Sequence, residues 1–242
     1  MIAPLTRHRR TNMTQTSEKT VGEIAAAYPA ASRVFEKHHI DYCCGGKRSL
    51  IDACRVAGTA AEEILEELAG ATGEDRDWNS APIADLVREI VERHHVWLHS
   101  ELPLIDHLFA LVGHSHAETR RVQRVFSQLK TEIESHMGKE ERFLFPAILE
   151  MDALRAAGKP IPRPPFGTIR NPITMMEHDH QLAIQYLDEI RDLTYGYDLP
   201  EDACHGLRMV YRELEALEAD LHRHIHLENN ILFPRVADWE RV

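Results

Sequence analysis

The sequence has no long apolar run. A membrane-spanning helix needs roughly 18 or more consecutive apolar residues, and the chain contains no such stretch. The basic residues at 7–10 are followed by polar residues, where a signal peptide would need an apolar segment. We therefore expect a cytoplasmic protein that has no membrane partner.

Positive charge is scarce as well. The chain carries 28 Lys and Arg residues against 39 Asp and Glu, which gives a formal net charge of −11. Non-specific binding of nucleic acid depends on clustered Lys and Arg, and the only such cluster lies in the N-terminal tail. A nucleic-acid partner is therefore not expected.

Cysteines are few, and familiar catalytic loops are missing. Four cysteines, two of them adjacent, do not form the framework of a disulfide-rich secreted domain, and a reducing compartment would keep them as thiols. The sequence also contains no nucleophile elbow, no phosphate-binding loop and no four-cysteine zinc motif. Histidine, in contrast, is plentiful: the acidic chain has 16, so their placement carries most of the functional information.

The first third of the chain is predicted to form a small helical region. We expect a disordered lead at 1–17, which is polar and lacks periodicity, and a small helical domain at 18–70. In the middle of that domain, Cys43 and Cys44 precede two glycines, which permit the tight backbone of a turn. Residues 71–80, with Gly, Thr, Asp and Asn, form the predicted linker.

Residues 81–240 are predicted to form a larger helical domain. Long helical patterns run at about 82–112, 117–157, 172–194 and 201–238, and Gly or Pro residues mark the breaks between them. Four helices of this length are typical of a bundle, so the predicted fold class is all-α.

An internal repeat relates the second of these helices to the fourth. The first copy consists of His136, Glu140, Leu144, Phe145 and Pro146. At one constant spacing, the second copy consists of His224, Glu228, Leu232, Phe233 and Pro234. The bundle therefore looks like two duplicated helical hairpins, each ending its second helix with the same pair of ligand-like side chains.

The repeated His and Glu residues lie on the apolar faces of their helices. In steps of three and four residues, the stripe of the second helix is Leu129, Ile133, His136, Glu140, Phe143 and Ala147. The stripe of the fourth helix is Val210, Leu214, Leu217, Leu221, His224, Glu228 and Ile231. A buried carboxylate is costly unless it is paired or binds a metal. A lone inward His is usually an ordinary core residue, but the duplicated pair favours a metal site.

Periodicity does not decide which other histidines face this site. In the first helix, His94 and His95 each lie on an acceptable apolar seam. In the third helix, a seam of Ile173, Met176, His180, Ala183 and Leu187 competes with one of Met175, His178, Leu182 and Tyr186. A further candidate is His114 or His116, at the start of the second helix.

Several motifs together resemble a known family. They are Asp41-Tyr42-Cys43-Cys44-Gly45-Gly46-Lys47, Leu102-Pro103, the stretch from His136-Met137 to Phe145-Pro146, and the stretch from His224-Ile225 to Pro234. On these motifs the chain is similar, from about residue 18 to 238, to the iron-sulfur cluster repair proteins known as repair-of-iron-centres proteins. That family has a hemerythrin-like four-helix bundle behind a short cysteine-bearing domain.

The resemblance implies a set of metal ligands and a cofactor. The implied ligands are His95, His116, His136, Glu140, His178, His224 and Glu228. The implied cofactor is a pair of non-haem iron ions, bridged by the two glutamates and an oxo group. Imidazole and carboxylate ligands in a bundle core are the pattern of di-iron carboxylate proteins, whereas structural zinc prefers four ligands, often thiolates.

The resemblance also implies a function. It is the repair of iron-sulfur clusters damaged by oxidative or nitrosative stress, by iron donation, by nitric oxide handling or by both, with damaged iron-sulfur proteins as partners. The alternatives, with the same centre, are a nitric oxide reductase and a sensor that binds oxygen or nitric oxide, so enzyme activity stays open. A homodimer is compatible with this reading.

Cys43 and Cys44 are expected to serve redox or transfer chemistry. Neighbouring Cα atoms about 3.8 Å apart are too close for an unstrained disulfide, so both residues should be available as thiols.

Overall fold

The computed structural model describes residues 19–28, 30–71, 76–113, 119–162, 164–201, 203–237 and 239. These residues are helical or lie in turns and loops, with no β-strand among them beyond an isolated bridge between Thr20 and Ser49. The predicted all-α class is therefore confirmed. The expected disordered lead at 1–17 lies outside the described residues.

Contacts divide the chain into two units. Unit 1 consists of Met1–Pro82 together with Ile225–Pro234, and unit 2 consists of Ile83–His224 with Arg235–Val242. The segment Ile225–Pro234 belongs to the last long helix of the chain, so this helix contributes residues to both units.

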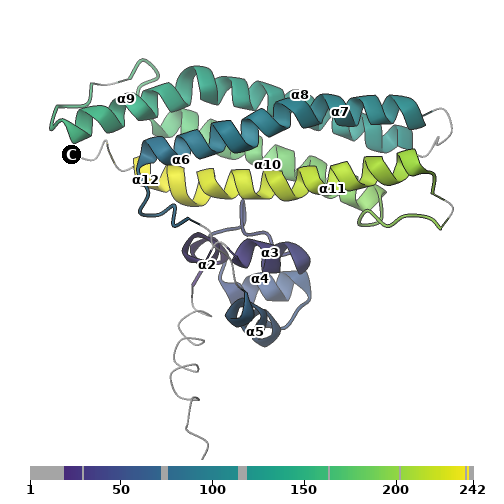
Figure 1. Ribbon diagram of the computed structural model, residues 1–242. Helices are drawn as coiled ribbons and strands as arrows, with labels where there is room; N and C mark the ends of the chain where they lie inside the picture. Colours follow the sequence, from purple (N-terminus) through teal and green to yellow (C-terminus); the bar gives the residue numbers. More distant parts are fainter. Residues whose placement is uncertain are drawn as a thin grey trace, which may run out of the picture. The chain divides into compact units, whose positions relative to one another are not determined.

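Among the described residues, four short helices lie in the N-terminal part of unit 1 (Figure 1): α2 (Val21–Ala27), α3 (Ala31–Lys37), α4 (Leu50–Ala57) and α5 (Ala61–Gly70). A capping box starts α2, because Thr20 Oγ1 accepts from the Glu23 amide at 3.2 Å and Glu23 Oε2 accepts from the Thr20 amide at 2.9 Å. Gly58 ends α4 in the left-handed conformation, at φ 73°. The apolar faces of these helices form one core, which includes Ile24, Phe35, Leu50 and Ile64.

Four long helical rods lie side by side in the remainder of the chain (Figure 1). They are α6–η1–α7 (Ile83–Glu89, Ile90–His95, Val96–Val112), α8–η2–α9 (Thr119–Lys139, Glu140–Leu144, Phe145–Ala156), α10 (Arg170–Leu193) and α11–η3–α12 (His205–His226, Leu227–Leu232, Phe233–Ala237). These are the four helices that the sequence predicts. Their inward apolar side chains form a second core, which includes Leu102, Phe109, Phe126 and Leu214. Among the described residues, no helix is long and apolar enough to span a membrane.

Three of the four rods are interrupted by a π-helical segment, and these segments contain His95, Glu140 and Glu228. A π-helical turn holds one residue more than an α-helical turn, so the buried face shifts by one position. The shift corrects the stripe predicted for the second helix. Phe143, expected inside, is 64 % exposed, whereas Leu144 is 1 % exposed and takes its place.

Candidate metal centre

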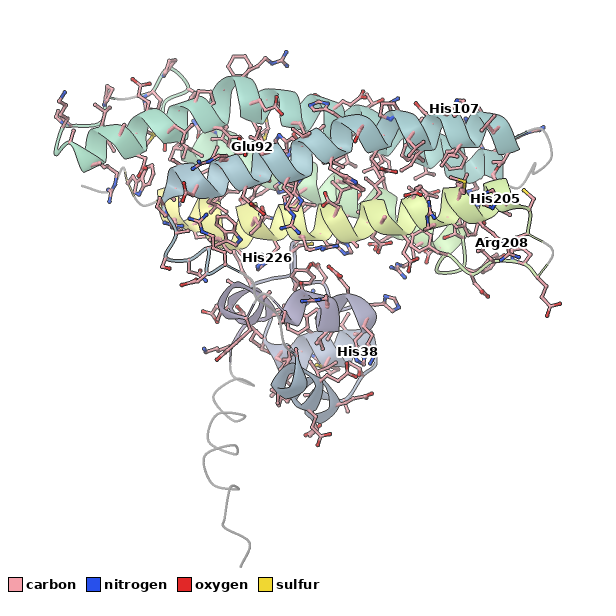
Figure 2. All side chains as sticks on the ribbon, in the orientation of Figure 1. His38, Glu92, His107, His205, Arg208 and His226 are labelled. Carbon is pink, nitrogen blue, oxygen red and sulfur yellow. The ribbon has the colours of Figure 1, made fainter. Side chains whose placement is uncertain are left out.

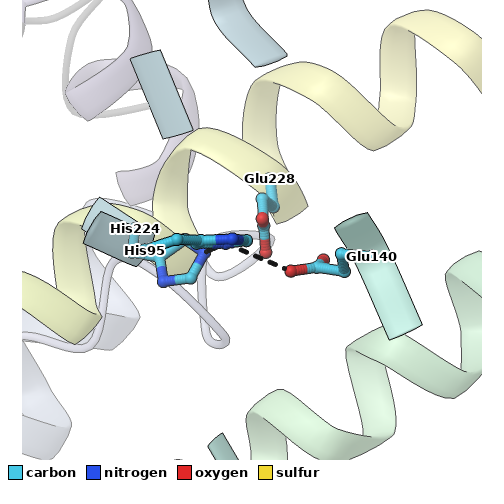
Figure 3. Close-up of side chains that lie close together, drawn as sticks. All are labelled: His95, Glu140, His224 and Glu228. Carbon is cyan, nitrogen blue, oxygen red and sulfur yellow. Dashed lines mark hydrogen bonds and ion pairs between the residues drawn. The ribbon is translucent and has the colours of Figure 1, made fainter. Parts of the chain in front are cut away.

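Two groups of buried side chains converge between the rods. The first is His95, Glu140, His224 and Glu228, and the second is His136, Glu140, His180 and Glu228. Within each group, the ligand atoms all lie within 4.8 Å of one another. Figure 3 shows the first group. Both glutamates belong to both groups, so they lie between two pairs of histidines. The first and fourth rods supply His95 and His224, and the second and third rods supply His136 and His180.

All six side chains are removed from solvent. Glu140 and Glu228 are fully buried, and none of the four histidines is more than 2 % exposed. Two carboxylates at this depth cost a large desolvation free energy unless positive charge compensates for it. The four histidines and the carboxylates supply only nitrogen and oxygen donors, which suit iron and other transition metals.

The spacing of the donor atoms fits shared cations. His95 Nε2 lies 3.2 Å from His224 Nε2, and His136 Nε2 lies 3.0 Å from His180 Nε2. Two donors that bind one ion at about 2.1 Å, roughly at right angles, would be about 3.0 Å apart. Glu140 Oε2 lies 3.4 Å from His95 Nε2, the ion pair marked in Figure 3. The same oxygen lies 3.2 Å from His136 Nε2, so this carboxylate reaches both histidine pairs. The residues present therefore fit a pair of metal ions.

Acidic side chains hold the outer nitrogens of two of these histidines. His95 Nδ1 lies 2.8 Å from Glu141 Oε1, and His136 Nδ1 lies 3.6 Å from Asp179 Oδ2. Asp179 is also bound by Lys139 Nζ at 2.8 Å. Burial by itself would raise the pKa of Asp179, but the neighbouring His136 ring, together with the hydrogen bond and positive charge of Lys139, outweighs it and lowers the pKa to about 2. Such partners fix the ring orientation of a metal-binding histidine.

His94 and His95 make different contacts, and these favour His95 as the donor. Both are buried, because the π-helical segment η1 turns both inward. His95 reaches the converging donors, whereas His94 Nδ1 binds Asp220 Oδ1 at 2.9 Å and its ring stacks on His224 with centroids 5.5 Å apart. His94 and Asp220 thus support His224 from outside the group, a role that the sequence pattern gave no signal for.

The third helix departs from the assignment implied by resemblance. His178 is exposed and is not among the converging donors, whereas His180 is 1 % exposed and belongs to the second group. The reason is the phase of α10: Ile173, Met176, Ala183 and Leu187 are buried together with His180, while Met175 on the other seam is 54 % exposed. His180 therefore replaces His178 in the candidate site. His116 lies outside the described residues.

Other histidines lie away from the converging group. His205 is the first residue of α11, so it precedes His224 by about 28 Å of helix axis. His107 is exposed on α7 (Figure 2). The abundance of histidine in the chain is thus only partly explained by the candidate metal site.

The Cys43–Cys44 turn is built around Asp41. Asp41 Oδ1 accepts from the amide of Cys43 at 3.2 Å and of Cys44 at 3.0 Å, and from the Cys43 thiol at 3.4 Å. A Cβ on Gly45 would lie 2.7 Å from Asp41 Oδ2, so this position needs glycine. Cys43 is buried and Cys44 is half-buried. The hydrogen bond to the Cys44 thiol, burial, and the negative charges of Cys44 and Asp41 raise the pKa of Cys43 well above its usual value.

Comparisons with known proteins agree with this arrangement. Residues 17–72 match the family model ScdA_N, described as a domain of unknown function, and residues 86–236 match the hemerythrin HHE cation binding domain. The iron-sulfur cluster repair protein YtfE of Pectobacterium carotovorum is 35 % identical over 92 % of this chain and 98 % of its own length. The YtfE protein of Escherichia coli is 34 % identical over 92 % of this chain and 98 % of its own length. Because these matches span both the cysteine-bearing and the hemerythrin-like regions, the chain belongs to the YtfE family of iron-sulfur cluster repair proteins.

Proposed function

We propose that this chain binds two iron ions and uses them to repair iron-sulfur clusters damaged by oxidative or nitrosative stress in the cytoplasm. The observation that supports it most directly is the sharing of Glu140 and Glu228 by both groups of buried donors. The family membership and the hemerythrin-like match support iron as the metal.

Each residue of the centre has a distinct role in this proposal. Glu140 and Glu228 would be shared by the two ions, His95 and His224 would hold one ion, and His136 and His180 would hold the other. His116 is a further candidate ligand. Glu141 and Asp179 orient His95 and His136, and the closed apolar rods keep bulk water from the ligands. When bound, the iron pair supplies redox chemistry and exchangeable ions.

Metal analysis with optical and electron paramagnetic resonance spectra tests the cofactor. Wild type should hold two irons per chain with the magnetic coupling of a bridged pair, whereas Glu140→Ala and Glu228→Ala should each hold less iron, because each removes a donor that both groups share. A protein without transition metal after reconstitution would contradict the proposal.

Iron donation is tested with an acceptor protein that has lost its cluster. The iron-loaded chain should restore the cluster of the acceptor when sulfide and reductant are supplied, and the Glu228→Ala protein should not. In this proposal Cys43 and Cys44 serve the redox or transfer step, with Cys44 as the more accessible thiol. Absence of transfer with and without reductant would contradict donation.

Reaction with nitric oxide is a second candidate. Each group of described donors offers four side chains, two histidines and the two shared glutamates, so an octahedral metal held there would keep positions open for a small ligand. Anaerobic product analysis distinguishes the alternatives, because a reductase forms nitrous oxide over several turnovers whereas a sensor binds nitric oxide or oxygen reversibly without product. The proposal also includes a homodimer. Light scattering of the purified chain tests this oligomeric state.

A further inference from the structure

Asn230 occupies a tightly built position within unit 1. Its Nδ2 donates to the main-chain oxygens of Tyr42 at 3.1 Å and Cys43 at 3.0 Å, and lies 3.1 Å from His226 Nδ1. The side chain therefore binds the first peptide groups of the Cys43–Cys44 turn directly. Because two carbonyl oxygens surround Nδ2, an oxygen in its place would be repelled.

Two glycines make room for the Asn230 amide. A Cβ on Gly22 would lie 2.5 Å from Asn230 Oδ1, and a Cβ on Gly46 would also collide with that oxygen. Gly22 belongs to α2 and Gly46 to the cysteine turn, and the Gly22 amide donates to the Gly46 oxygen at 2.9 Å. Neither glycine has a positive φ, so the backbone itself does not require glycine at these positions. Close approach of Asn230 is one reason for both, and main-chain oxygens add to it: a Cβ on Gly22 would lie 2.8 Å from Gly46 O, and a Cβ on Gly46 would lie 2.9 Å from Tyr42 O.

The same helix turn carries a metal ligand. Asn230 follows Glu228 by two residues in the π-helical segment η3, and side chains two apart in a helix point to nearly opposite sides. Glu228 thus faces the histidines while Asn230 faces the cysteine turn. Asn229 adds a contact on the same side, with its Nδ2 3.7 Å from Cys44 Sγ. Glu228, Asn230 and both cysteines all belong to unit 1.

We propose that Asn230 is a positioning residue that joins the Cys43–Cys44 turn to Glu228, so that iron binding and the reactivity of the thiols depend on each other. The inference rests on the metal site of the proposed function. A cation that fixes Glu228 fixes η3, and η3 holds the turn through the Asn230 amide. By thermodynamic linkage, opening of the turn then weakens iron binding by the same factor as iron disfavours that opening.

The first test needs no metal. In the metal-free protein, alkylation of Cys44 by iodoacetamide is followed by mass spectrometry, with the buried Cys54 as an internal reference. Asn230→Asp and Asn230→Ala should each raise the rate about tenfold, because two hydrogen bonds that hold the turn are lost. Gly46→Ala should do the same by displacing the amide. Asn171→Ala, which removes another side-chain bond to a main-chain oxygen, and Gly70→Ala, which has open space around it, should leave the rate unchanged.

The second test adds ferrous iron without oxygen. Iron should slow alkylation of Cys44 about fivefold or more in the wild-type chain. The effect of iron should disappear in Asn230→Ala, and also in Glu228→Gln, which keeps Asn230 but loses a donor to the ions. Far-ultraviolet circular dichroism checks that each variant is folded.

Two results would overturn the inference while leaving the proposed function intact. One is an unchanged alkylation rate in Asn230→Asp, Asn230→Ala and Gly46→Ala. The other is normal uptake of two irons with an alkylation rate that iron does not change. Failure of the wild-type chain to take up iron would instead contradict the proposed function.

Discussion

A matched pair of variants on α10 tests which of two nearby histidines binds the metal. His180 is buried among the converging donors, whereas His178, two residues earlier, is exposed. We expect His180→Ala to lower the iron content by about one ion per chain, or to weaken binding by 10–100-fold or more, the range seen when even outer partners of a metal are removed. His178→Ala should bind iron as wild type does. Equal losses in both variants, measured by metal analysis, would show that the assignment of His180 is wrong.

The two shared glutamates should lower the stability of the metal-free chain. Glu140 and Glu228 are buried side by side, so without cations their like charges repel each other away from water. Glu140→Gln keeps the shape and removes one charge, so it should raise the free energy of unfolding of the metal-free protein by about 1–3 kcal/mol. The same substitution should lower the stability of the iron-loaded protein. Urea unfolding with and without iron measures both effects, and a loss of stability in both states would contradict the expected reversal of sign.

Cys43 should be a slow nucleophile at neutral pH. Its pKa is raised by the hydrogen bond to Cys44, by burial, and by the nearby charges of Cys44 and Asp41, so the neutral thiol persists where a free cysteine begins to ionise. Since only the thiolate reacts, alkylation of Cys43 should be slower than that of free cysteine at pH 7 and should still rise about tenfold per pH unit above pH 9. Asp41→Asn removes one negative charge and should move the profile to lower pH. A profile for Cys43 that levels off below pH 9 would rule out the raised pKa.

At the scale of elements, sequence periodicity predicts the rods well and fails where the helix type changes. The four predicted helices match the observed rods, because long apolar stripes and Gly or Pro breaks are local signals. The stripe places His136 and Glu140 together, but it places Phe143 inside, since no local signal marks the π-helical segment η2. For α10, the uninterrupted seam through His180 describes the buried face, whereas transfer by resemblance selects His178. Periodicity alone therefore predicts the buried face of α10, the one described rod without a π-helical segment.

The π-helical segment η2 gives a prediction of its own. Deletion of the exposed Arg142 would restore α-helical spacing from Glu140 to Leu144, Ile148 and Met151, so the apolar face stays continuous and the chain should fold. The widened turn that carries Glu140 is lost, and iron binding should weaken at least tenfold. Deletion of Gln128, which lies in regular α8, is the control. It rotates the rest of the rod by about 100°, so the apolar face after residue 128 no longer points to the core, and the melting temperature should fall. Tight iron binding by the Arg142 deletion would show that the π-helical turn is not needed for the site.

At the scale of the molecule, the metal ions should act as cross-links between all four rods. Donors come from α6–η1–α7 (His95), α8–η2–α9 (His136 and Glu140), α10 (His180) and α11–η3–α12 (His224 and Glu228). Iron that binds the folded chain alone adds about 2.7 kcal/mol of stability when its concentration is 100 times the dissociation constant. For a chain of this size we expect the melting temperature to rise by roughly 5–10 °C on loading and to return after chelation.

This thermal shift distinguishes a bridged centre from adventitious metal binding. His178→Ala should keep the full shift, because the exposed ring lies outside the group, while Glu228→Gln should lose most of it. Amide hydrogen exchange locates the effect: protection on loading should concentrate in Glu140–Leu144 and Leu227–Leu232, the two segments that carry the shared carboxylates. A melting temperature that rises equally in wild type and Glu228→Gln would place the iron elsewhere on the chain. A site that lacks one of its two shared carboxylates cannot hold the rods together with the same free energy.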